Sequence, residues 1–196
     1  MKNILTLVLA SSLAGFAAAC STSETTNTAA NTAPTNTAPK TAARDEVPPS
    51  VHAVFPDAQS ITKDHKDLTP AQIAAIEKET GGKLPDTDHH AYLAFSTSGG
   101  ARKEIGAATE LNVGGKHVVV AYESRNGLPY IREVRGEGLA QSFLDQFKGK
   151  GHDDKFQIGQ DLKAQGVDDA TGKAVASAIH VDIMTMQTLY GAADKH

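Results

Sequence analysis

Apolar residues near the C-terminus recur at the spacing of an α-helix. Between residues 171 and 190 the intervals between them are four, four, three and four residues, which places them on one helical face. This pattern predicts an amphipathic helix over residues 171–190. Its expected buried face consists of Val175, Ile179, Ile183, Met186 and Tyr190.

Two further helices are predicted upstream. Thr69 can cap a helix that begins at Pro70, Gln72 completes a capping box, and the Gly81–Gly82 pair ends it. A shorter helix is expected where apolar residues share one face before Gly149, which stops it. These residues are Leu139, Phe143, Leu144 and Phe147.

Apolar runs separated by turn residues predict strands between these helices. The Gly114–Gly115 and Asn126–Gly127 pairs suit tight hairpins, so we expect consecutive strands to form an antiparallel meander. Because strand runs and helix runs segregate along the chain, the fold class is predicted to be α+β, with the sheet packed against helices. The predicted strands are Ala91–Phe95, Ala107–Val113, His117–Glu123 and Pro129–Val134.

Residues 1–19 have the pattern of a secretory signal: a basic start, an apolar stretch and three alanines. The chain's one cysteine, Cys20, follows directly, and this arrangement resembles the lipobox of bacterial lipoproteins. The resemblance implies that Cys20 is lipidated and becomes the first residue of an exported protein, anchored to a membrane and facing the periplasm or the cell exterior. The same resemblance implies that Ser21, in place of an aspartate, favours the outer membrane. An ordinary signal cut that leaves a free thiol is the alternative.

Residues 20–50 are predicted to form the lipid attachment point and a disordered tether. Thr, Ala, Asn, Ser and Pro dominate this segment, and Val47 is its one large apolar residue. A flexible segment of this length has a root-mean-square reach of roughly 30 Å. Residues 51–196 are then expected to form one domain, large enough for its own core.

Composition excludes several classes of function. The chain carries 19 Lys and Arg against 23 Asp and Glu, a net charge of -4, so it lacks the basic excess of a nucleic-acid binder. A single cysteine excludes a disulfide framework and a four-thiolate metal site. The sequence also lacks the G-x-S-x-G and H-E-x-x-H motifs of common hydrolases.

Two segments contain residues that could bind a ligand, one a metal ion and the other a phosphate. Asp86, Asp88, His89 and His90 offer the nitrogen and oxygen donors that zinc or copper binds, which indicates a metal site as one hypothesis. Adjacent histidines on a strand point to opposite faces, so a polar loop entering a strand is the competing interpretation. The second segment, residues 167–177, opens the last predicted helix, where amides and the Lys173 ammonium favour a phosphate; a plain capped helix start is the alternative.

Five segments, in order, resemble the bacterial extracytoplasmic FMN-binding domain. They are Phe55–Ala58, Leu68–Gln72, Val118–Arg125, Phe143–Lys150 and Val167–Ser177. This domain occurs in subunits of the sodium-pumping quinone reductase and Rnf electron-transport complexes and in regulators of nitrous oxide respiration. The resemblance covers about residues 52–190 and implies that family's fold, FMN as cofactor, and electron transfer with a redox partner rather than stand-alone catalysis.

The family's signature, Ser-Gly-Ala-Thr-x-Thr/Ser-Ser, often carries FMN as a phosphoester of its Thr. Without gaps, the signature aligns with residues 171–177, and the resemblance then implies that Thr171, Gly172, Lys173, Ala174 and Ser177 contact the cofactor. Ala174 has no hydroxyl, so FMN would be held noncovalently by the backbone of residues 172–174 and by Lys173. A second register makes Thr171 the covalent attachment point and sets Asp168 and Asp169 beside the phosphate.

A flavin ring needs an apolar, partly aromatic slot, for which Tyr122, Tyr130, Phe143 and Phe147 are candidates. We expect Tyr122 and Phe147 to contact the ring. The function that follows is an exported, lipid-anchored FMN-binding protein in electron transfer. One alternative is a flavin-free structural or adaptor lipoprotein that keeps the fold without the cofactor. Another is a metal-binding envelope protein that uses His89, His90 and either Asp86 or Asp88.

Overall fold

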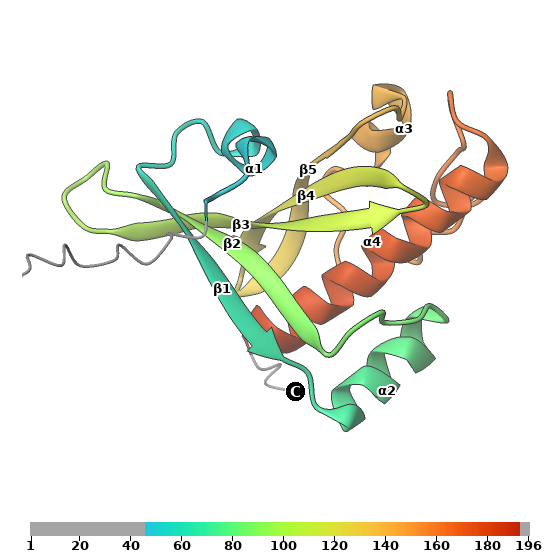
Figure 1. The fold of residues 1–196 in the computed structure, drawn as a ribbon, viewed down its shortest axis with the longest axis horizontal. Helices are drawn as coiled ribbons and strands as arrows, with labels where there is room; N and C mark the ends of the chain where they lie inside the picture. Colours follow the sequence, from blue (N-terminus) through green and yellow to red (C-terminus); the bar gives the residue numbers. More distant parts are fainter. Residues whose placement is uncertain (1–45, 193–196) are drawn as a thin grey trace, which may run out of the picture. The chain divides into compact units, whose positions relative to one another are not determined.

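The computed structural model describes residues 46–192 (Figure 1). The predicted signal, Cys20 and most of the predicted tether lie outside the described residues. Helix α1 spans Pro49–Val54, so the last two residues of the predicted tether are helical. Val47 already packs against the hydrophobic core, and the folded part therefore begins a few residues before the expected boundary at residue 51.

Five strands form one antiparallel sheet in the order β1-β2-β3-β4-β5, and each strand pairs with the next along the chain. The predicted α+β class and the predicted meander are thus confirmed. The first strand was not expected from the sequence, because its eight residues SITKDHKD contain one apolar side chain. The strands are β1 Ser60–Asp67, β2 Asp88–Ser96, β3 Lys103–Val113, β4 Lys116–Arg125 and β5 Leu128–Gly136.

The two predicted hairpin turns connect β3 to β4 and β4 to β5. Both residues of each turn have positive φ: 58° and 77° at Gly114 and Gly115, and 55° and 85° at Asn126 and Gly127. Two consecutive positive φ values belong to the tight turn whose twist matches the twist of the flanking strands. The local sequence therefore fixes the register of these strands.

Helix α2, Pro70–Thr80, lies between β1 and β2 in the chain and has the predicted caps. Gln72 N–H donates to Thr69 Oγ1 at 3.3 Å, while Thr69 N–H donates to Gln72 Oε1 at 2.9 Å. Gly81 ends the helix with φ 67°. The helix predicted around residues 139–147 is shorter than expected, because α3 covers Gln141–Leu144 and a 3-10 turn, η1, covers Asp145–Phe147.

Helix α4, Asp169–Tyr190, is the long C-terminal helix and packs across one face of the sheet (Figure 1). Side chains alternate along β4, so Val118, Val120 and Tyr122 join the α4 side while Val119 and Ala121 join the α1 side. Helix α2 packs beside α4 through a smaller apolar cluster that includes Ile76 and Val181. Within residues 46–192, no helix is long and apolar enough to cross a bilayer.

Candidate functional site

The predicted cofactor residues Thr171, Gly172, Lys173, Ala174 and Ser177 occupy the first turns of α4. Asp168 caps this helix: its carboxylate accepts hydrogen bonds from Thr171 N–H at 2.9 Å and from the Thr171 hydroxyl at 2.7 Å. These two hydrogen bonds, the backbone one foremost, lower the pKa of Asp168, so the carboxyl stays ionised at neutral pH. The positive end of the helix therefore faces a charge from its own chain.

Helix α4 begins at Asp169, two residues before the predicted start. Gly172 N–H consequently donates to the Asp168 carbonyl at 2.9 Å. Lys173 and Ala174 lie further inside the helix, where each amide donates to the carbonyl four residues earlier. The backbone amides of residues 172–174 are thus used by the helix, and an anion at this place must be held by side chains.

Lys173 and Ser177 line a surface cavity of about 380 Å³ between α2 and α4, which we call the α2–α4 groove. Lys155 adds a second ammonium, although its Nζ lies 3.3 Å from the Glu79 carboxylate. Two lysines and one glutamate leave a net positive charge among the lining side chains. The groove is lined by Glu79, Thr80, Lys155, Phe156, Gln157, Ile158, Lys173, Ser177 and His180.

An aromatic stack connects this groove to the protein core. The His180 ring stacks on Phe156 with centroids 5.1 Å apart, and Phe156 stacks on Phe147 at 6.0 Å. His180 is 6% exposed. Burial, with a smaller contribution from the Lys155 charge, lowers the pKa of His180, so the ring is neutral at pH 7. Phe156 has φ 55°, which is uncommon for a residue with a side chain.

Tyr122 and Phe147, the two residues expected to contact the flavin ring, lie inside the protein rather than in the groove. Phe147 is fully buried and reaches the groove through Phe156. Tyr122 is 2% exposed and borders a cavity of about 40 Å³, which is too small for a three-ring flavin. Neither side chain therefore presents a free face to a flavin in this structure.

Tyr122 instead belongs to a buried polar cluster around Asp182, which we call the Asp182 cluster. The Tyr122 and Thr109 hydroxyls each donate to Asp182 Oδ2 at 2.5 Å, and His89 Nε2 lies 3.2 Å from Oδ1. Burial raises the pKa of Tyr122 well above its usual range, and the Asp182 charge raises it further. The phenol therefore stays protonated and acts as a donor to the carboxylate.

The Asp182 cluster was not anticipated from the sequence. Asp182 and its partners His89 and Thr109 border a cavity of about 290 Å³. One signal was present: Asp182 lies three residues after Ile179 and next to Ile183, on the apolar stripe of the helix. A charged residue in that stripe indicates a buried carboxylate that needs donors.

The predicted metal ligands do not meet at one point. His89 turns inward to Asp182, whereas His90 is exposed on the opposite face of β2, where its ring stacks on His65 of β1. The expectation that the two adjacent histidines diverge is confirmed. Asp86 uses its carboxylate to accept the Thr87 amide in the preceding turn.

Compared with protein-family models, with curated proteins and with solved structures, the chain matches none of them. The likeness to the FMN-binding domain therefore rests on the sequence segments named above. The residues of the α2–α4 groove fit a phosphate-bearing ligand in part: Lys155, Lys173 and Ser177 supply side-chain donors, and Phe156 and Ile158 supply apolar surface. The capped start of α4 does not add backbone donors to them.

Proposed function

We propose that the protein is an exported, lipid-anchored carrier that binds FMN noncovalently in the α2–α4 groove and takes part in electron transfer. One observation supports the placement: Lys173 and Ser177, both implied by the family resemblance, line the same cavity as Lys155. Its volume of about 380 Å³ falls in the range of small-molecule sites, which is about 300–1,000 Å³.

Within this proposal the side chains replace the missing ester. Lys155 and Lys173 would hold the phosphate as compact positive charges, and the Ser177 hydroxyl would donate a hydrogen bond to it. Phe156 and Ile158 would supply apolar surface to the ring. The flavin would supply the redox chemistry, while the protein sets its exposure to solvent and to a redox partner.

The anchor is proposed from the sequence. A lipidated Cys20, followed by a long polar segment, would hold the folded unit within reach of a membrane-bound partner. This arrangement suits a carrier that exchanges electrons between two partners rather than an enzyme that works alone.

Titration of the purified, detergent-solubilised protein with FMN tests the proposal through quenching of flavin fluorescence. Lys173→Glu should weaken binding at least tenfold, because it places a negative charge beside the phosphate. Glu79→Gln should strengthen binding, since Lys155 loses its competing carboxylate. Lys63→Glu makes the same charge change on β1 and should leave binding unchanged, because Lys63 pairs with Tyr92, whose side chain packs on the sheet face away from α4.

The second candidate function, a flavin-free structural or adaptor lipoprotein, is favoured by a specific observation. The Thr171 hydroxyl and amide both donate to the Asp168 carboxylate, so this carboxylate occupies the N-terminus of α4, where a phosphate would otherwise bind. A colourless protein whose addition leaves FMN fluorescence unchanged would support this second function. Intact mass under denaturing conditions identifies a third outcome, because a phosphoester at Thr171 would add the mass of FMN less one water.

A further inference from the structure

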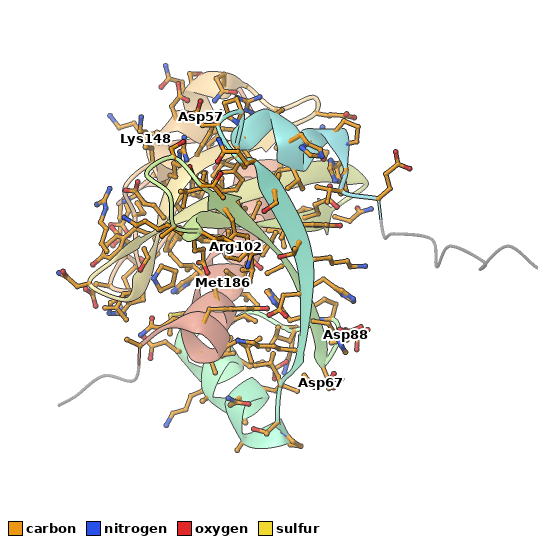
Figure 2. All side chains as sticks on the ribbon, turned by 90° about the vertical axis from the view of Figure 1, so that its left-hand side faces the viewer. Asp57, Asp67, Asp88, Arg102, Lys148 and Met186 are labelled. Atoms are coloured by element: carbon orange, nitrogen blue, oxygen red, sulfur yellow. The ribbon has the colours of Figure 1, made fainter. Side chains whose placement is uncertain are left out.

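Two histidines and two aspartates form a compact patch on the exposed end of the β1–β2 ladder. His65 of β1 pairs directly with His90 of β2, and Asp67 pairs with Asp88. Side chains two residues apart on a strand share a face, so all four lie on the same side of the sheet. We call these four residues the His–Asp patch, and Figure 2 shows Asp67 and Asp88 near one another at this end of the two strands.

The donor atoms of His65, His90 and Asp88 lie close enough together to surround one ion. His65 Nε2 is 2.6 Å from Asp88 Oδ1, and His90 Nδ1 is 3.4 Å from the same oxygen. His65 Nε2 is also 3.6 Å from Asp67 Oδ1. In a tetrahedral site with bonds of about 2.0–2.1 Å, neighbouring ligand atoms lie about 3.3 Å apart.

The charges of the patch favour a cation. Asp67 and Asp88 are directly opposite each other across the ladder, a position in which two like charges destabilise strand pairing. The two histidine rings, with centroids 5.1 Å apart and planes 25° apart, hold their nitrogens beside these carboxylates. A divalent ion at this point would offset the repulsion and join the edge strand β1 to β2.

We propose that the His–Asp patch binds one divalent transition-metal ion of the zinc and copper(II) class. His65, His90 and Asp88 bring two imidazole nitrogens and one carboxylate oxygen within 4.8 Å of one another, a mixed donor set that these ions accept, and Asp67 lies beside His65. The four side chains are between 39% and 71% exposed, so an ion reaches them from solvent without any opening of the fold. His65 of β1 takes the place that His89 had in the sequence-based hypothesis.

The site is independent of flavin binding. Residues 90, 92 and 94 lie on the same face of β2, because every second side chain of a strand points to the same side. Tyr92 and Ala94 pack in the apolar cluster under α1, so His90 lies on the α1 side of the sheet and not on the α4 side. The α2–α4 groove therefore shares no lining residue with the patch. Loss of metal binding and loss of FMN binding are thus separate results.

Calorimetric titration of the tag-free, metal-stripped protein with zinc chloride, and separately with copper(II) chloride, tests the proposal. We expect one ion per chain with a dissociation constant in the micromolar range or tighter for at least one metal. His65→Ala, His90→Ala and Asp88→Asn should each weaken binding at least tenfold. His52→Ala removes an exposed histidine of α1 and should leave binding unchanged.

Nuclear magnetic resonance of the imidazole protons supplies a second readout. Zinc should shift the ring signals of His65 and His90 and leave those of His89, which faces Asp182, in place. Circular dichroism of each variant shows whether it folds, and His65→Gln or His90→Gln replaces the alanine variant at the same position if that variant does not fold. The proposal is overturned if neither ion binds, or if binding persists unchanged in both histidine variants.

Discussion

Removal of one hydroxyl from the Asp182 cluster tests whether this buried carboxylate depends on its donors. Tyr122→Phe deletes the oxygen that lies 2.5 Å from Asp182 Oδ2 and keeps the ring, which is 2% exposed within the core. No large cavity is created, because one atom is lost. The change in stability therefore reports mainly on the hydrogen bond and on the carboxylate left with two donors, Thr109 and His89.

The expected loss follows from the charge of the acceptor. A hydrogen bond to a charged group contributes about 1.5–3 kcal/mol to stability, against about 1 kcal/mol for a neutral pair. We expect the free energy of unfolding to fall by about 2 kcal/mol. For a domain of this size, this loss corresponds to a decrease in Tm of roughly 4–8 °C.

Urea unfolding followed by circular dichroism at pH 7 measures this loss. The slope of the free energy against urea should stay the same, because the variant exposes the same surface on unfolding. Tyr130→Phe is the matched control: it deletes a phenolic oxygen that has no hydrogen-bond partner among residues 46–192, and it should change stability by less than about 0.5 kcal/mol.

A double-mutant cycle assigns the loss to Asp182. In an Asp182→Asn background the carboxylate charge is gone, so Tyr122→Phe should cost at least about 1 kcal/mol less than in the native protein. Two results would refute the reasoning. One is a loss no larger than that of Tyr130→Phe, and the other is an equal loss in both backgrounds.

Two further predictions concern the sheet and the groove. Gly106→Ala should lower stability by about 3 kcal/mol in urea unfolding, because a Cβ would lie 2.4 Å from the Tyr122 carbonyl oxygen; Gly115→Ala, with nothing within 4 Å, should cost about 1 kcal/mol for its positive φ. The pKa of His180 is lowered from 6.5, so the unfolded chain binds its proton more readily and stability should fall as pH decreases through about 6.5 toward the folded pKa. Urea midpoints between pH 7.5 and 5.5 should therefore fall more steeply in the native protein than in His180→Gln, and equal slopes would contradict this.

Local sequence signals predicted much of the fold. The Thr69 capping box, the paired positive-φ turns and the apolar stripe of α4 each act within a few residues, and each is present in the structure. Strand β1 was not predicted because it is a polar edge strand with one face largely in solvent, and it therefore lacks an alternating apolar pattern. Its pairing with β2 is set by partners more than twenty residues away, which no local pattern indicates.

The candidate sites show the same difference between local signals, which the sequence reveals, and long-range contacts, which it does not. Lys173 and Ser177 are four residues apart on one helix, so their shared face could be inferred, but Lys155 joins them through tertiary packing. The donors to Asp182 come from three different strands, at residues 89, 109 and 122. His65 could not enter the metal hypothesis because its strand was not predicted.

Zinc binding to the His–Asp patch should restore the stability lost by Tyr122→Phe, although the two places lie on opposite faces of the sheet. A ligand that binds the folded chain alone stabilises it by about 2.7 kcal/mol when its free concentration is a hundred times the dissociation constant. This gain exceeds the expected loss of about 2 kcal/mol. Thermal unfolding of Tyr122→Phe with and without zinc measures it. The recovery should vanish in Tyr122→Phe with His90→Ala, and a Tm that zinc lowers instead would mean that the ion prefers the unfolded chain.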